Sequence, residues 1–140
     1  MELTKVQKNA LYAILAISIL GTLGSLFFSE IMKYAPCSLC WYQRILLYPI
    51  VLISATGIVL NDRNAYKYLF LFPVLGMFVA IFHNLLYLGA ISESLLPCTE
   101  GVSCLTKYFE LWGFITLPLL SLLGFTAIIF FLAIFKRSNK

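Results

Sequence analysis

The sequence predicts an all-α membrane protein: a bundle of four transmembrane helices with both termini cytoplasmic and two outward loops, each carrying a cysteine pair. Three observations predict this fold. The chain is 61% hydrophobic and only 11% charged, whereas soluble domains carry roughly 25% charged residues. Its apolar residues gather in four long segments. Most basic residues lie at the termini and in the second connection between those segments, whereas the cysteines lie in the first and third connections.

A membrane-spanning helix needs about 20 mostly apolar residues, and four segments meet this condition. We expect spans at residues 10–28, 41–60, 68–91 and 111–135 of a single domain that covers residues 1–140. The first segment follows Lys5 and Lys8, as a signal peptide would. Its apolar run is long for such a peptide and no clear cleavage site follows, so we expect it to be retained.

Charged residues are scarce inside the other three spans. The second has Arg44 near its start, the third has His83 as its one ionisable residue, and the fourth has no charge after Glu110. Prolines also fall inside these spans, where neighbouring helices and local adjustments re-satisfy the freed backbone groups. They are Pro49, Pro73 and Pro118.

The basic residues predict the orientation, because cytoplasmic loops carry an excess of lysine and arginine. With four spans, seven basic residues share one side: Lys5, Lys8, Arg63, Lys67, Lys136, Arg137 and Lys140. The other side has Lys33, Lys107 and the membrane-edge Arg44, with four of the six acidic residues. We therefore expect both termini in the cytoplasm and the loops at 29–40 and 92–110 outside it.

All four cysteines fall in the two outward loops, Cys37 and Cys40 in the first and Cys98 and Cys104 in the second. Disulfides persist on the oxidising side of a membrane and are rare in the cytosol. The orientation comes from charge and the cysteine placement from position. Their agreement supports both.

The first pair, in "PCSLC", stands where the second span begins. A helix N-terminus favours an anion, and Arg44 adds a fixed charge one turn after Cys40. Both effects favour the thiolate, the reactive form of cysteine. The alternative is a static disulfide or two packed thiols. A disulfide between cysteines so close in sequence would stabilise the fold little, because it closes only a short loop. We expect Cys37 and Cys40 to be redox-active.

The second pair, Cys98 and Cys104 in "PCTEGVSC", lies in a polar loop that an outside protein could reach. A structural disulfide explains this pair equally well. A zinc site made of all four cysteines is disfavoured, because Cys-x5-Cys is not a usual zinc spacing. We therefore expect no metal site.

Two membrane residues have both a functional and a structural interpretation. For Arg44 the functional interpretation is that it stabilises an anion, and the alternative is that it extends to the lipid headgroups and does nothing else. For His83 the functional interpretation is a role at a site, since intramembrane ionisable groups are often functional, and the alternative is packing alone. Asn84 beside it could bond a neighbouring helix.

Thiols at a bilayer surface need an electron acceptor, and the sequence has no Gly-rich dinucleotide motif and no haem-attachment motif. A membrane-soluble quinone fits, because its oxygens become anionic on reduction and Arg44 could stabilise them. The basic residues are scattered among apolar segments and form no aromatic-interleaved face. Nucleic acid is therefore not an expected partner, whereas membrane lipid is.

These motifs resemble a known family. "PCSLCWYQR" is similar to the signature of the DsbB family of membrane thiol:quinone oxidoreductases, in spacing and in its place at the second of four spans. "FHNLLY" resembles that family's histidine-containing stretch, and "ELWGFITLPLLSLLGF" resembles its entry into the fourth span. The short "PCTEGVSC" resembles the Gram-positive BdbC-like branch.

The resemblance implies a four-helix enzyme of the bacterial cell membrane, with its active face extracytoplasmic. It would reoxidise a DsbA-like (BdbD-like) thioredoxin-fold thiol oxidase and pass the electrons to menaquinone or ubiquinone in the quinone pool. Disulfide bonds in secreted proteins would depend on it. Cys98 would form the mixed disulfide with the partner and Cys104 would be its mate. Cys40 would face the quinone, Cys37 would be its mate, and Arg44 would contact the quinone.

Two other functions fit part of the pattern. Vitamin K epoxide reductase-like enzymes also join a four-helix bundle to two cysteine pairs and a quinone. In them the loop pair comes first in the chain, whereas here Cys37 and Cys40 come first. A non-catalytic membrane protein with two structural disulfides is the other alternative. Such a protein would never form a mixed disulfide with a secreted thiol protein.

Overall fold

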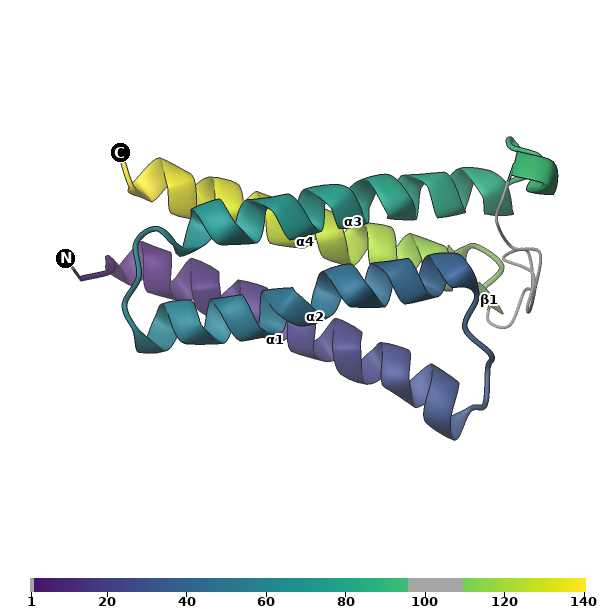
Figure 1. The fold of residues 1–140 in the computed structure, drawn as a ribbon, viewed down its shortest axis with the longest axis horizontal. Helices are drawn as coiled ribbons and strands as arrows, with labels where there is room; N and C mark the ends of the chain where they lie inside the picture. The colour runs from purple at the N-terminus through teal and green to yellow at the C-terminus, as the bar shows by residue number, and fades with distance from the viewer. Residues whose placement is uncertain (1, 96–109) are drawn as a thin grey trace.

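Four long helices form the body of the protein (Figure 1). The computed structural model describes residues 2–95 and 110–140. The long helices are α1 (Lys5–Leu26), α2 (Ser38–Val59), α3 (Ala65–Tyr87) and α4 (Leu117–Ser138). The shorter elements are the π-helix η1 (Phe27–Ile31), the 3-10 helix η2 (Glu93–Leu95) and two strands, β1 (Glu110–Leu111) and β2 (Ile115–Thr116). Within the described residues, four helices are long and apolar enough to cross a membrane, which confirms the expected helical architecture.

The helices form a closed ring in which each packs against the next along the chain and α4 packs against α1. Both termini lie at one end of the bundle (Figure 1). There Asn139 accepts hydrogen bonds from Arg63 at 2.8 Å and from Gln7 at 3.4 Å, and the hydroxyls of Thr4 and Ser138 lie 3.1 Å apart. These polar contacts close the bundle at its terminal end. That this end is cytoplasmic stays a prediction.

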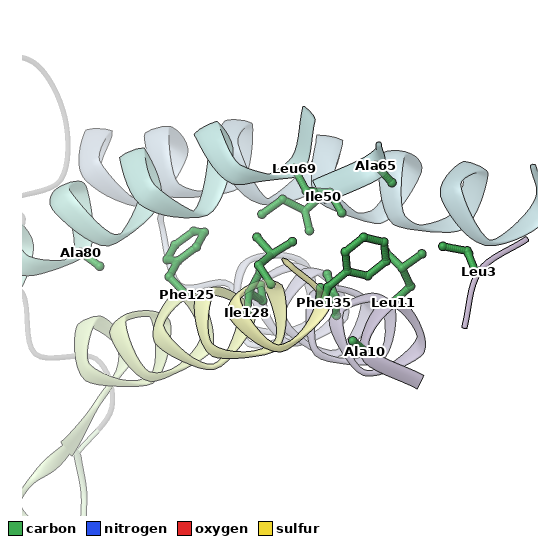
Figure 2. Packing of buried hydrophobic residues seen from close by; sticks show 12 residues of the cluster. Leu3, Ala10, Leu11, Ile50, Ala65, Leu69, Ala80, Phe125, Ile128 and Phe135 are labelled. Carbon is green, nitrogen blue, oxygen red and sulfur yellow. The ribbon is translucent and has the colours of Figure 1, made fainter. Parts of the chain in front are cut away.

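The core runs along the axis of this ring (Figure 2). Its fully buried side chains come from all four helices and include Leu11, Ile14, Ile50, Leu69, Ile128 and Phe135. The outer surface is equally apolar, with large exposed side chains such as Leu52, Val59, Phe78 and Phe130. Lipid tails are as apolar as leucine, so tight packing rather than burial from water holds such helices together.

Two helices begin or end at a different residue from the expected span, and local hydrogen bonding explains both differences. Helix α1 starts at Lys5 rather than at 10, because Thr4 and Gln7 form a reciprocal capping box. Helix α3 ends at Tyr87 rather than at 91. Gly89 takes the left-handed conformation, with φ +76°, that ends a helix. The N–H groups of Gly89 and Ala90 bond the carbonyls of Leu86 and Leu85.

The largest difference is at the fourth span, expected from 111. A short hairpin of β1 and β2 precedes α4, with Glu110 paired to Thr116. Trp112 and Gly113 both take positive φ in its turn. Helix α4 starts only after Thr116, whose hydroxyl accepts from the Leu119 N–H. This stretch is as apolar as a membrane-spanning helix, and hydropathy therefore predicted a span here. Its glycine and β-branched residues favour a strand and turn instead.

Two of the three prolines expected inside spans lie within helices, and the third lies at a helix start. Pro49 lies inside α2 and Pro73 inside α3, as expected. Pro118, expected inside a span, instead occupies the first turn of α4. A proline costs little there, because the first-turn N–H groups have no partner within the helix.

Gly76 allows α3 and α4 to approach closely. A Cβ atom added at Gly76 would overlap the ring of Phe125. We expect Gly76→Ala to destabilise the fold by about 1–3 kcal/mol, the usual effect of overpacking. Thermal unfolding in detergent would measure the effect.

Gly124, next to Phe125 on α4, provides the matched control. A Cβ atom there meets nothing within 4 Å. Gly124→Ala should therefore be neutral or stabilising by about 0.5–1 kcal/mol, since alanine is the better helix former. Equal destabilisation by both variants would contradict close packing at Gly76.

Candidate functional site

The first cysteine pair lies at the N-terminus of α2, as the sequence predicts. Cys37 is the N-cap residue and Cys40 belongs to the first turn. Their Sγ atoms lie 3.2 Å apart, beyond the S–S bond length of about 2.05 Å. The two sulfurs are therefore in contact without being bonded to each other. Cys37 is only 6% exposed, whereas Cys40 is partly exposed.

His83 brings α3 to this pair. Its Nε2 atom lies 3.9 Å from the Cys37 sulfur, and its Nδ1 atom lies 3.2 Å from the Gln43 side-chain amide. The histidine is 3% exposed. Each ring nitrogen thus faces a partner on α2, which holds the ring with one edge toward the thiol. His83 is in a position to exchange a hydrogen bond or a proton with Cys37.

Arg44 is buried between α2 and α1. Its Nε donates to the Ser25 hydroxyl at 2.6 Å, and its Nη2 donates to the Ser25 carbonyl at 2.8 Å. Its guanidinium also lies over the Trp41 ring, 5.2 Å from the centroid. The side chain therefore points into the protein. The headgroup alternative would require it to point to the surface. No carboxylate in the described part of the chain pairs with this charge.

A cavity of about 330 Å³ connects these groups. Its walls include Cys37, Cys40, Arg44 and His83, with apolar side chains from α1, α2 and α4. The C-terminal half of α1 diverges from α2 toward this end of the bundle (Figure 1). Gly24 on α1 also lines the cavity, and a Cβ atom added there would meet nothing within 4 Å. The cavity is thus lined mainly by apolar side chains, with the thiols, the Arg44 guanidinium and the His83 ring among its polar groups, as ligand sites often are.

Two site residues escaped the sequence analysis. Gln43 stands within the quoted "WYQR", yet nothing in the letters shows that it faces a histidine of another helix. Ser25 is one of several small residues in "GTLGSLFF" and carries no signal of its bond to Arg44.

Two other expectations concern neighbouring residues. Asn84 donates to the Pro118 carbonyl at 2.8 Å, which confirms the expected bond to a neighbouring helix. Cys98 and Cys104 lie outside the described residues.

Comparison with known proteins decides the family. The family described as "Disulfide bond formation protein DsbB" matches residues 7–135. The chain belongs to the DsbB family. It is 42% identical over 130 residues to "Disulfide bond formation protein C" of Bacillus subtilis (strain 168), covering 93% of this chain and 94% of that protein.

Other relatives of the DsbB family extend this match. "Probable disulfide formation protein C 2" of Bacillus anthracis is 43% identical over 119 residues, 83% of this chain and 84% of that protein. "SPbeta prophage-derived disulfide bond formation protein B" of Bacillus subtilis is 40% identical over 126 residues, 89% and 84% of the two chains. No solved structure matches significantly. Family and fold together identify a multi-pass membrane redox protein of disulfide bond formation.

The burial of the two sulfurs predicts unequal reactivity. In a reduced chain that carries Cys98→Ser and Cys104→Ser, a small neutral maleimide should modify Cys40 several-fold faster than Cys37. The reason is access: Cys40 is partly exposed, whereas Cys37 is buried against His83. Peptide mass spectrometry after short exposures would measure both rates. Faster modification of Cys37 would contradict the observed burial.

Proposed function

We propose that this member of the DsbB family is a thiol:quinone oxidoreductase that reoxidises an extracytoplasmic DsbA-like thiol oxidase. One observation carries the proposal: a cysteine pair at a helix N-terminus shares a largely apolar cavity with a buried arginine. Within the described residues, that arginine has no acidic partner. A buried charge that lacks a counter-ion is costly in a membrane protein, and a ligand that becomes anionic would offset the cost.

The cavity residues fit a quinone. The apolar walls suit a lipid-soluble ring, and Leu47 and Phe125 are among them. The guanidinium of Arg44 is fixed by two hydrogen bonds to Ser25, so it needs no reorganisation to face a developing charge. When bound, menaquinone or ubiquinone would accept two electrons and two protons and leave as quinol. Arg44 and His83 would hold it beside Cys40.

The cysteines of the chain would carry the electrons. The thiolate of the reduced partner attacks the Cys98–Cys104 disulfide at Cys98, and Cys104 leaves as a thiolate. Cys104 then attacks Cys37 of the Cys37–Cys40 disulfide, and Cys40 is released next to the cavity. The second thiolate of the partner attacks the partner sulfur of its mixed disulfide and releases Cys98, which attacks Cys104, re-forms the outer disulfide and releases Cys37. Two-electron oxidation of the resulting Cys37–Cys40 dithiol by the quinone restores the inner disulfide. Each turnover thus moves two electrons from the partner dithiol to the acceptor and leaves both pairs of the chain as they began.

His83 would stabilise the deprotonated form of Cys37 in the inner cysteine pair, Cys37 and Cys40. With Gln43 donating to Nδ1, the Nε2–H of His83 points to Cys37 and stabilises a thiolate there. Cys37 also caps α2, where the positive end of the helix dipole favours the same charge. Both effects would make Cys37 a good leaving group when Cys98 attacks Cys104 in the Cys104–Cys37 mixed disulfide.

The proposed orientation places the cysteine end of the bundle outside the cytoplasm. The termini and the N-terminus of α2, which carries the cysteine pair, lie at opposite ends of the bundle (Figure 1), and seven of the ten basic residues belong to the terminal side. A secreted thioredoxin-fold partner would then reach the outer loop. The quinone pool would reach the cavity from the lipid.

Replacement of Arg44 tests the acceptor site. Arg44→Gln should raise the quinone KM about ten- to a hundredfold, because hydrogen bonds to a charged group contribute about 1.5–3 kcal/mol and about 1.4 kcal/mol is tenfold. Quinol formation with a small dithiol as electron donor would be measured in detergent.

Arg63→Gln serves as the matched control. Arg63 lies at the opposite end of the bundle and bonds Asn139, so its loss should leave the quinone KM unchanged. An unchanged KM in Arg44→Gln would remove Arg44 from the acceptor site.

Replacement of the outer pair tests the relay. A chain with Cys98→Ser and Cys104→Ser should reduce quinone with a small dithiol at nearly the parent rate, because the inner pair and cavity are intact. It should fail to oxidise a DsbA-like partner. Stopped-flow fluorescence of the partner would follow this step. Partner oxidation at the parent rate would contradict the relay and leave the outer disulfide a structural role.

A further inference from the structure

Three potential metal ligands converge at the head of the cavity. One ligand atom each from Cys37, Cys40 and His83 lies within 4.8 Å of the other two. Atoms that bind one tetrahedral zinc ion lie about 3.5–3.8 Å apart, given Zn–S of about 2.3 Å and Zn–N of about 2.0–2.1 Å. The sulfur–sulfur distance of 3.2 Å and the sulfur–Nε2 distance of 3.9 Å lie on either side of this value. Small side-chain rotations would bring all three atoms into ligation.

We propose that Cys37, Cys40 and His83 bind a thiophilic divalent cation, Zn²⁺, when both cysteines are reduced. Two thiolates and one imidazole form a known three-ligand zinc set that leaves a fourth position open. The sequence argued against zinc because the cysteine spacings do not form a four-cysteine site. The third ligand comes instead from α3, which the spacing of cysteines cannot reveal.

Gln43 supplies the support that such a histidine needs. A metal-bound histidine usually donates its other ring N–H to an outer partner, which fixes the ring and its tautomer. The Gln43 amide lies 3.2 Å from His83 Nδ1. Rotation about the last side-chain bond presents its oxygen as an acceptor. The Nε2 lone pair is then directed at Cys37 and the metal position. Gln43 and His83 are both buried, and their side chains are already in contact before any ion arrives.

The open fourth position would face the cavity, since all three ligands line it. Arg44 lines the same cavity, and its charge opposes a cation. Two thiolates outweigh that single charge, so binding requires the reduced pair and releases protons. A bound ion would sequester both sulfurs and prevent them from closing a disulfide. This last consequence, inhibition by zinc, rests on the proposed function, whereas the binding itself does not.

Cobalt provides a direct probe of the ligand set. The full-length chain with Cys98→Ser and Cys104→Ser would be purified in detergent, reduced with a phosphine, desalted without oxygen and titrated with Co²⁺. We expect one equivalent to bind, with thiolate-to-cobalt absorption in the near ultraviolet and the visible bands of a tetrahedral ion. Zn²⁺ should then displace it. Absence of these bands in the reduced protein, or their retention after oxidation of the pair, would overturn the proposal.

Variants of α3 test the third ligand. His83→Ala should weaken Zn²⁺ binding, measured by competition with a chromophoric chelator, by more than the about 10–100-fold loss typical of an outer partner. Asn84→Ala is the matched control, because its side chain bonds Pro118 and does not face the thiols. It should leave zinc affinity unchanged. Equal affinity in His83→Ala and the parent would remove the histidine from the site.

Arg44→Gln separates this proposal from the proposed function. Loss of the positive charge should tighten Zn²⁺ binding in the chelator competition, whereas it should weaken quinone. Tighter zinc binding with an unchanged quinone KM would overturn the acceptor site alone. A raised quinone KM without any zinc binding would overturn the metal site alone.

Discussion

The fold depends on one constraint, that a bilayer core offers no hydrogen bonds to the backbone or to side chains. Each of the four long helices satisfies its own backbone, and most hydroxyls inside them do the same. Ser54 bonds the Ile50 carbonyl and Thr126 bonds the Leu122 carbonyl one turn earlier. Among the described residues, few polar side chains bond a different helix. Apart from Asn84, those near the cysteine end are Gln43, Arg44 and His83, which line the same cavity as the thiols.

The two ends of the bundle differ in how closely their helices pack. At the terminal end, Asn139 joins Arg63 and Gln7, and the core beneath is filled by Leu11 and Phe135. At the cysteine end, α1 diverges and small residues leave space. The same sequence thus combines a tightly packed half, which holds the helices in register, with an open half, which can admit a ligand. Packing at the closed end supplies the rigidity that a preformed cavity needs.

The proposed function and the proposed metal site assign two kinds of ligand to the same atoms at the thiol pair. Arg44 would favour an anion in the cavity, and a reduced dithiol with His83 would favour a soft cation. Which one prevails depends on the redox state of Cys37 and Cys40, because only the reduced pair brings negative charge. The proposed reaction takes this pair through a dithiol state at a membrane surface, and that state would be open to thiophilic metals.

The sequence by itself determined the four apolar helices, the cysteine pair at a helix start and the arginine one turn later, because hydropathy, spacing and helix periodicity are local properties. The hydropathy of the sequence placed the start of the fourth helix too early. Gly113 and Thr116 belong to a hairpin there, which apolar composition does not reveal. Only the tertiary structure brought His83 and Gln43 to Cys37 and Ser25 to Arg44. Those contacts join separate helices, and their geometry depends on how the helices pack, which no single segment encodes.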